Sequence, residues 1–276
     1  MSAIVAQVEG RQVRLTSLTK VMYPKLNVTK SQVIDYYATI GPQIIEQTSG
    51  RPVTRIRFPH GIGHQSFFEK NAPDGMPEWI PEMVVSSIHY PVFDEVAAVV
   101  WSAQINALEL HTPQWREPGR CDRLVVDLDP GPGAGLAQCC EVALLVADYL
   151  TSDGLSAVPV TSGSKGMQLY VPFPEPMDAD AVLHYARSMA GDLSNAHPQA
   201  IVATMTKSKR EKRVFIDWSQ NNPAKTTITP YSLRGKDLPF AATPVTWDEV
   251  REGLTEQFLF TETMARVQEY GDLMQA

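Results

Sequence analysis

The sequence predicts a mixed α/β (α+β) fold, with a mixed β-sheet flanked by helices and a smaller N-terminal subdomain. Segments with helical spacing of apolar residues are mixed with short runs rich in β-branched and aromatic residues, which is the pattern of helices packed on a sheet. The chain has 276 residues, of which 43% are hydrophobic and 20% charged. This length and composition suffice for one large domain or two closely joined ones.

Three segments are predicted to be helices. Thr29 and Gln32 form the T-x-x-Q pattern of a capping box and precede apolar residues at helical spacing, which predicts a helix over residues 29–47. A second amphipathic stretch covers residues 136–151 and is followed by Gly154, a typical stop signal. The third predicted helix covers residues 179–193.

Short β-rich runs predict the strands. Residues 51–70 are expected to form strands joined by a turn at Pro59 to Gly61. Further strands are predicted at 124–129, 157–161, 167–173, 213–218 and 226–231. Because two of the three predicted helices and most predicted strands follow residue 115, we expect a single domain made of an N-terminal subdomain (1–115) and a catalytic subdomain (116–276).

Composition argues against several classes of protein. No apolar run approaches the roughly 18–20 residues needed to cross a bilayer, and residues 1–14 lack the pattern of a secretory signal. The three cysteines, Cys121, Cys139 and Cys140, include no CxxC, which argues against a disulfide framework and a structural zinc. We therefore expect a cytoplasmic protein with no membrane partner.

The charge is unevenly distributed along the chain. The net charge is −7, yet residues 205–236 contain eight basic side chains and only two acidic ones, while residues 237–276 are strongly acidic. A polyanion responds to the local field rather than to the total charge, so the basic segment is compatible with nucleic-acid binding. Charge alone is equally compatible with a solvated loop.

Two aspartates end a predicted strand. Side chains alternate along a strand, so Asp127 and Asp129 should share one face while Val126 and Leu128 enter the core. Two carboxylates about 6–7 Å apart along one face can hold one or two divalent cations. The alternative is a strand that simply runs into an Asp-Pro-Gly turn.

A third aspartate, Asp217, interrupts the apolar run Val214 to Trp218. A buried carboxylate is costly without a partner, which predicts either a cation beside it or a salt bridge to a nearby basic residue.

Further candidates surround these carboxylates in the sequence. The small residues of Ser162 to Gly166, with Lys165 among them, suit close approach to an anion, although the spacing is not that of a Walker A loop. Lys225 and Arg234 flank a strand-like segment and can contact phosphates. Both features also occur in ordinary solvated turns.

His111 and the pair Phe67–Phe68 are weaker candidates. A histidine that follows an apolar run is more often a satisfied core residue than a ligand. Aromatic rings can stack on bases, but adjacent residues of a strand point to opposite faces, so packing of at least one ring in the core is the favoured interpretation.

Nine segments, taken in order, resemble the polymerase domain of bacterial ligase D, within the archaeo-eukaryotic primase superfamily. The resemblance runs from about Leu15 to Trp247. The segments are LTKVMYP, VTKSQVIDYY, GRPVTRIRFP, FFEK, ALELH, DRLVVDLDP, VTSGSKG, FIDWSQN and KTTITPYSLRG.

The resemblance implies a template-directed nucleotidyltransferase that uses two divalent cations, with Mn²⁺ preferred to Mg²⁺. It also implies roles for individual residues. The metal ligands are Asp127, Asp129 and Asp217, with His111 beside them and the incoming sugar. The triphosphate pocket contains Ser162, Lys165, Gln168 and Arg234, with Lys225 nearby. The DNA contacts are Lys20 and Lys30 at a 5′-phosphate, Phe67 and Phe68 on the template, and Arg210 at the primer end.

The resemblance also implies substrates and partners. These are gapped or broken DNA with a 5′-phosphate, nucleoside triphosphates with ribonucleotides preferred, and Ku and a DNA ligase in end-joining repair. The chain ends where the polymerase fold ends, which suits a stand-alone enzyme or a domain of a longer protein.

Two positions depart from the family pattern, and two rival functions follow from the same motifs. Gln168 stands where the family usually has histidine, and Ile56 where lysine is commoner. A DxD glycosyltransferase also binds a cation with a carboxylate pair, but it requires neither Asp217 nor a 5′-phosphate grip. A DNA-end-binding module with a decayed active site is the non-enzyme alternative.

Overall fold

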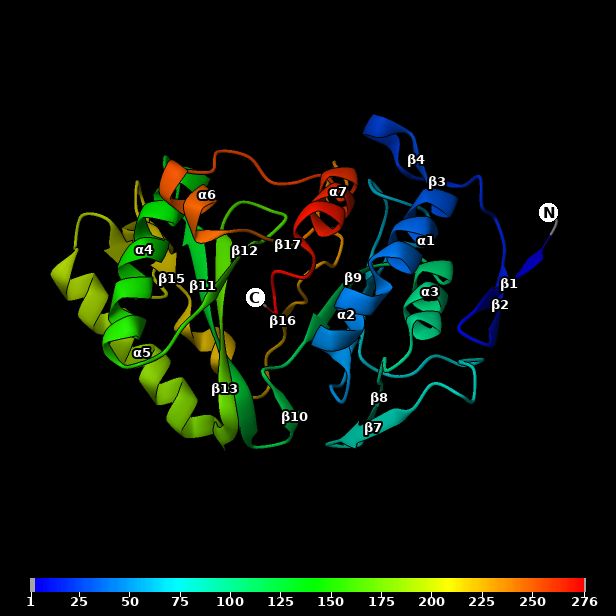
Figure 1. The fold of residues 1–276 in the computed structure, drawn as a ribbon, viewed down its shortest axis with the longest axis horizontal. Coiled ribbons are helices and arrows are strands. Elements are labelled where there is room, and N and C mark those ends of the chain that lie inside the picture. Colours follow the sequence, from blue (N-terminus) through cyan, green and yellow to red (C-terminus); the bar gives the residue numbers. More distant parts are fainter. Residues whose placement is uncertain (1–2, 276) are drawn as a thin grey trace. The chain divides into compact units, whose positions relative to one another are not determined.

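The computed structural model describes residues 3–275, and the chain divides into two compact units (Figure 1). Unit one comprises residues up to Thr112 together with Ile228–Ala242 and Leu259–Asp272. Unit two comprises Pro113–Thr227, Thr243–Phe258 and the last residues. The chain therefore returns to unit one twice. The functional division predicted between residues 115 and 116 stays a prediction.

The helices of unit one are α1 (Lys30–Thr39), α2 (Gly41–Thr48), α3 (Val96–Gln104) and α7 (Phe260–Tyr270). The helix predicted over residues 29–47 is thus two helices that meet at Ile40. Pro42 lies in the first turn of α2, where its missing N–H costs nothing, but it cannot continue the hydrogen bonds of α1. The capping box is confirmed, since the Thr29 amide donates to Gln32 Oε1 at 2.9 Å.

Unit one contains a four-stranded sheet in the order β16 (Thr227–Ile228), β9 (Ala107–Thr112), β5 (Thr54–Arg57) and β6 (Phe67–Glu69). Shorter pairs join β1 (Ile4–Val8) to β2 (Arg11–Leu15), β3 (Val21–Tyr23) to β4 (Val28–Thr29), and β7 (Glu82–Val85) to β8 (Ile88–Pro91). The predicted turn before β6 is confirmed. Gly61 has φ +82°, and a Cβ there would lie 2.8 Å from the Val21 carbonyl oxygen, so glycine is required.

Unit two is built on a seven-stranded sheet. The order is β14 (Ile201–Val202), β15 (Val214–Ile216), β11 (Arg120–Pro130), β13 (Met167–Asp178), β12 (Val158–Thr161) and β17 (Thr243–Pro244), with β10 (Trp115–Glu117) also paired to β11. Only the β14–β15 pair is parallel, so the predicted mixed sheet is confirmed.

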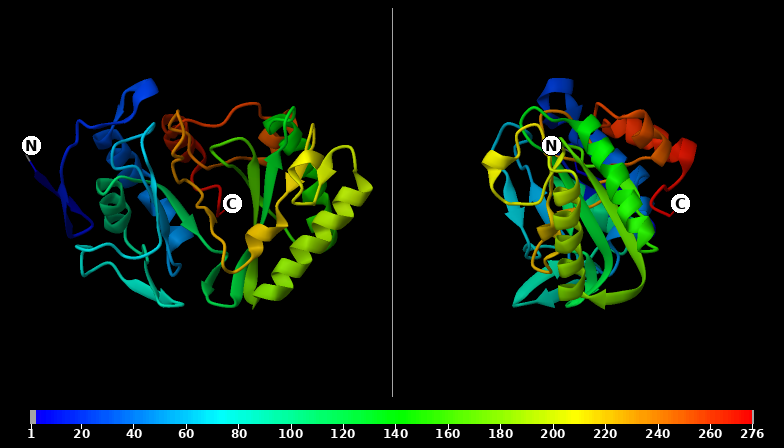
Figure 2. Two further views of the ribbon diagram at one scale, coloured as in Figure 1. Left: turned by 180° about the vertical axis from the view of Figure 1, so that it is seen from behind. Right: turned by 90° about the vertical axis from the view of Figure 1, so that its left-hand side faces the viewer.

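Helices α4 (Leu136–Ser152) and α5 (Ala179–Ala196) lie against this sheet, and α6 (Trp247–Glu252) packs on α4 (Figures 1 and 2). Both long helices begin where the sequence predicts, and each runs slightly beyond its predicted end. The middle of β11, from Leu124 to Leu128, is buried apart from a small exposed part of Asp127, which explains why this strand is an apolar run.

Two of the differences from the prediction have a direct physical reason. Helix α3 is not predicted, because it is apolar all round and nearly all its residues are buried, which removes the periodicity that marks a helix. The strand predicted at 226–231 is reduced to Thr227–Ile228. Beyond it the chain turns at Tyr231, whose φ of +69° is incompatible with a strand.

Two further features of the described residues concern the expected class of protein. Cys121, Cys139 and Cys140 are buried, and none of them forms a disulfide in the described residues. Within residues 3–275, no helix combines the length and the apolar character that a membrane crossing requires.

Candidate active site

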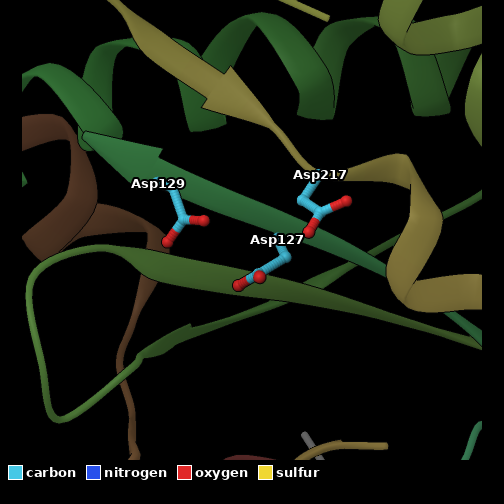
Figure 3. A group of neighbouring side chains, drawn as sticks. All are labelled: Asp127, Asp129 and Asp217. Atoms are coloured by element: carbon cyan, nitrogen blue, oxygen red, sulfur yellow. The ribbon is translucent and has the colours of Figure 1, made fainter. Parts of the chain in front are cut away.

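Three carboxylates converge in unit two (Figure 3). Asp127 and Asp129 project from one face of β11, while Val126 and Leu128 are 1% and 0% exposed in the core. Asp217 follows β15, the strand paired to the end of β11, and its amide donates to the Asp127 carbonyl at 2.8 Å. The pairing register therefore places the third carboxylate opposite the first. One oxygen from each of the three side chains lies within 4.8 Å of the other two.

Asp217 is held by the turn that it begins. It caps the short 3₁₀ helix η3 (Trp218–Asn221). Its Oδ1 accepts hydrogen bonds from the Ser219 amide at 3.1 Å and from Ser219 Oγ at 2.5 Å, and its Oδ2 accepts one from Gln220 Nε2 at 3.1 Å. These contacts orient the carboxylate. The basic neighbour is Lys225, whose Nζ lies 4.0 Å from Asp217 Oδ2 and donates to Ser219 Oγ.

The donor set fits a hard divalent cation. Asp127 and Asp217 are each only 9% exposed, and carboxylates buried close together are costly without a compensating partner such as a cation. Carboxylate oxygens are the ligands that Mg²⁺, Mn²⁺ and Ca²⁺ prefer, whereas zinc and copper sites usually add nitrogen or sulfur. Both interpretations of Asp127–Asp129 hold in part, because the strand also runs directly into a turn at Gly131. We therefore assign the cluster as a candidate site for divalent cations.

Gln168 contacts this cluster directly. It lies on β13 opposite Asp127 and is 4% exposed. Its Nε2 donates to Asp127 Oδ1 at 3.1 Å, and its Oε1 accepts a hydrogen bond from the Tyr170 hydroxyl at 3.1 Å. The tyrosine fixes the orientation of the amide, so that the NH₂ group rather than the oxygen faces the carboxylate.

Hydrogen bonds within the loop and from Gln257 occupy several backbone groups of the loop from Ser162 to Gly166. The Ser162 amide donates to the Gly166 carbonyl, and the Ser164 amide donates to Ser162 Oγ. Gln257 closes the loop from outside, since it accepts from the Gly163 amide at 2.7 Å and donates to the Gly166 carbonyl at 3.0 Å. The amides of Gly163 and Ser164 are thus already hydrogen-bonded within the protein, as in an ordinary turn. The basic side chain of this loop is that of Lys165, which is exposed.

A cavity of about 560 Å³ lies beside the loop. It is lined by the turn after β11, the first residue of α4, and the 162–166 loop: Pro130, Gly131, Pro132, Gly133, Ala134, Gly135, Leu136, Ser164, Lys165, Thr255 and Gln257. Asp129 immediately precedes this lining. The cavity lining therefore includes both the exposed Lys165 and the turn that directly follows Asp129 at the end of β11.

His111 of unit one lies on β9, close to Glu109, for which no role was predicted. Leu108 and Leu110 are buried in the core, so the alternation of the strand places Glu109 and His111 together on its other face. His111 Nε2 lies 2.8 Å from Glu109 Oε2. The side chain of His111 is 14% exposed, so it is not a fully buried core residue.

Arg234 lies in a segment that buried side chains anchor. The Tyr23 hydroxyl donates to the Arg234 carbonyl at 2.8 Å, Tyr36 donates to the Tyr231 carbonyl at 2.7 Å, and the Tyr37 hydroxyl accepts from the Leu233 amide at 3.1 Å. These three tyrosines are at most 1% exposed. The segment that carries the arginine is therefore fixed from the core of unit one.

Two lysines lie together in unit one, without a carboxylate. Lys30 is only 2% exposed, and its Nζ makes no hydrogen bond or ion pair with any residue in the described range. Burial, and then the charge of Lys20, lower the pKa of Lys30 to about 8. Lys20 Nζ donates to the Pro59 carbonyl at 2.8 Å. A buried lysine whose charged neighbour is another lysine is suited to binding an anionic ligand.

Phe67 and Phe68 are 43% and 59% exposed, so neither ring is packed in the core. The interpretation favoured from the sequence is wrong here, because β6 is the edge strand of its sheet and both of its faces are open. Glu69 ties this strand to β5 through an ion pair with Arg57 at 2.8 Å.

Arg210, in unit two, stacks on Phe215, with the carbon of its guanidinium group 3.5 Å from the centre of the ring.

The comparisons with known proteins agree on one family. Residues 29–274 match the family model described as LigD, primase-polymerase domain. The chain is 44% identical over 271 residues to a multifunctional non-homologous end joining protein LigD of Mycolicibacterium smegmatis, and 31% identical over 255 residues to a bifunctional one of Bacillus subtilis. These alignments cover 95% and 92% of this chain but only 36% and 42% of the relatives. The chain thus spans little more than a third of the length of these relatives.

A solved structure is also similar. It is described as the polymerase domain from Mycobacterium tuberculosis ligase D in complex with DNA. The TM-score is 0.92 with 42% sequence identity, and the match covers 95% of this chain and 96% of that one.

Proposed function

Because the chain belongs to the LigD primase-polymerase domain family, we propose that it is a template-directed nucleotidyltransferase that extends DNA primer ends and fills short gaps. The observation that carries this proposal is the meeting of Asp127, Asp129 and Asp217. A DxD glycosyltransferase needs no third carboxylate from a separate strand, and the family match leaves that alternative without support. We further propose a role in end-joining repair, with Ku and a DNA ligase as partners.

We propose that Asp127 and Asp129 each bind two cations, that Asp217 binds one of them, and that Mn²⁺ is preferred. When bound, the cations supply charge stabilisation to the attacking and leaving oxygens of an in-line displacement. The protein holds the ligands in place through the Ser219 and Gln220 bonds to Asp217 and the Gln168 bond to Asp127. Lys225 also lies beside the Asp217 carboxylate and donates to Ser219 Oγ.

The remaining residues bind substrate in this proposal. Ser162, Lys165 and Arg234 contact the triphosphate, with Lys225 nearby, and His111 lies by the incoming sugar. Lys20 and Lys30 bind the 5′-phosphate of the downstream strand, Phe67 and Phe68 stack on the template, and Arg210 places the primer end. The exposure of both phenylalanines and the unpaired burial of Lys30 support these roles.

The direct test is extension of a gapped duplex with a 5′-phosphate, with Mn²⁺ and Mg²⁺ compared. Extension that requires template and divalent cation is the expected result. Tight binding of the same DNA without extension would instead favour a DNA-end-binding module.

We expect ribonucleotides to be preferred to deoxynucleotides. A pocket that hydrogen-bonds the 2′-hydroxyl leaves its own polar group unpaired when a deoxynucleotide binds. Steady-state kinetics with matched ribo- and deoxynucleotides on one template should give a higher kcat/KM for the ribonucleotide. Equal values would contradict the proposed sugar pocket.

Gln168→His is expected to raise kcat. A histidine can keep both observed contacts, since one ring nitrogen can donate to Asp127 while the other accepts from Tyr170. It also offers the proton-transfer capacity that an amide lacks, a function typically worth ~10²–10⁴-fold. Single-turnover extension measures the change, and Gln168→Leu, which loses the donor to Asp127, should be slower than wild type. A Gln168→His variant no faster than wild type would show that the departure is neutral.

A further inference from the structure

The buried carboxylate of Glu109 in unit one lies beside both His111 and Arg234, which have different roles in the proposed function. Glu109 is 5% exposed. Its Oε2 lies 2.8 Å from His111 Nε2. Its Oε1 accepts a hydrogen bond from the Gly235 amide at 2.7 Å and lies 3.6 Å from Arg234 Nε.

Glu109 is the negatively charged partner of both His111 and Arg234. Ile56, its cross-strand neighbour on β5, carries no charge. Burial opposes ionisation, but the bond to His111 and the charge of Arg234 outweigh it and lower the pKa of Glu109 to about 2. Glu109 is therefore a carboxylate at every working pH and can only accept hydrogen bonds. In this contact, His111 must then carry a proton on Nε2 and donate it to Glu109 Oε2.

We propose that Glu109 is a positioning residue that fixes the His111 tautomer and the Arg234–Gly235 segment at the same time. This inference rests on the proposed function for its role in nucleotide binding, but not for its geometry. The segment is otherwise held through backbone groups by Tyr23 and Tyr37, so Glu109 is the contact that joins it to the histidine. This coupling would hold His111, which is proposed to lie by the sugar, and Arg234, which is proposed to contact the triphosphate, in one fixed arrangement.

Glu109→Gln separates the two contacts while keeping the size of the side chain. An amide has one acceptor oxygen. If that oxygen faces Gly235, the NH₂ group faces His111 and favours the other tautomer. If it faces His111, the NH₂ group opposes the Gly235 amide and Arg234. Either way, one of the two bonds is lost, and so is the negative charge beside Arg234.

The expected kinetic result is a fall in kcat/KM for the nucleotide of about 10- to 100-fold, the range for losing hydrogen bonds to a charged group. The effect should be less than additive with His111→Asn and with Arg234→Lys, because all three changes disturb one unit. Binding of gapped DNA should stay near wild type. Glu95→Gln is the matched control, since Glu95 pairs with Arg11 in the same unit and should leave the kinetics unchanged.

A readout that needs no catalysis tests the geometry itself. The chain has six histidines, so His111→Asn identifies the His111 signals in long-range ¹H–¹⁵N spectra. Wild type should give the Nε2–H tautomer. In Glu109→Gln, either this tautomer or the Gly235 amide shift should change. If Glu109→Gln destabilises the fold, Glu109→Asp, which keeps the charge but shortens the reach, should lose one of the two contacts.

The outcomes distinguish this inference from the proposed function. A wild-type protein that binds DNA but extends no primer would overturn the proposed function, and the spectra would still decide the geometry. A wild-type protein that extends primers, combined with a Glu109→Gln variant that has unchanged kcat/KM, tautomer and Gly235 shift, would overturn only the inference.

Discussion

Replacing Asp127 or Asp217 with asparagine is expected to abolish primer extension while leaving the binding of gapped DNA nearly intact. Charge stabilisation by bound cations is worth several kcal/mol in the transition state, so a loss of about 10³-fold or more is expected. The affinity for DNA comes instead from lysine and arginine contacts to phosphates. Asp122→Asn is the matched control, because Asp122 lies on the same strand but pairs with Arg116.

The same variants make a second prediction that does not depend on activity. Removing one of three mutually repelling carboxylates should raise Tm in the absence of metal, since like charges within 4.8 Å oppose folding. Adding Mn²⁺ should raise the Tm of wild type and of Asp122→Asn, but not that of Asp127→Asn. Extension by either cluster variant at more than a few per cent of wild type would sink the assignment of the metal ligands.

The affinity for a downstream 5′-phosphate is expected to fall as pH rises through about 8. Because the pKa of Lys30 is about 8 in the free protein, the lysine loses its proton above that pH and can no longer pair with the phosphate. The affinity should drop roughly five- to tenfold between pH 8 and pH 9. Binding of the same DNA without the 5′-phosphate should lack this step. Fluorescence anisotropy with the two gapped duplexes measures the difference.

Lys30→Met supplies the matching stability test. A lysine whose pKa is lowered in the folded state disfavours the folded state when it is charged. This cost is absent above the unfolded pKa of 10.5 and is complete below about pH 8. A lowering of this size corresponds to about 3 kcal/mol at pH 7.

Lys30→Met should therefore increase the free energy of unfolding at pH 7 while abolishing the preference for 5′-phosphorylated DNA. Lys20→Met should weaken the preference without the gain in stability. A preference that survives in both single variants, or independent effects of removing the lysines and the phosphate, would show that the lysines contact something else.

Much of the fold follows from local pattern. The alternation in Asp127-Leu128-Asp129 predicts two carboxylates on one face, because a strand has a period of two whatever its neighbours are. The periodic segments that became α4 and α5 are also predicted within a few residues, since an amphipathic stripe reports both the helix and its buried face. Helix α3 escapes the same reasoning because it is buried all round.

The carboxylate cluster needed more than pattern. Asp217 is 88 residues from Asp129 in the sequence, and only the pairing of β15 with β11 brings it to Asp127. Pairing between strands is decided by the packing of the whole sheet, which no local window contains. The resemblance predicted the same triad, but by analogy and not from the residues themselves.

The exposure of the phenylalanines was also a tertiary outcome. In the middle of a sheet, at least one of the adjacent rings of Phe67 and Phe68 would face the core. The sequence does not show that β6 lies at the edge of its sheet. Lys30 is the opposite case. A lysine in the first turn of a predicted helix is expected at the surface, yet it is buried here, because the residues around it come from separate segments.

Residue type and short-range periodicity predict the candidate carboxylates and basic side chains and the local structures that carry them, because both are properties of neighbours in the chain. Which of these residues meet depends on the packing of distant segments. This packing gave Asp217 its place opposite Asp127, gave Gln168 its bond to the same carboxylate, and made Glu109 the link between His111 and Gly235. Each of these contacts joins different strands or loops, so its geometry is fixed by the packing of the unit as a whole.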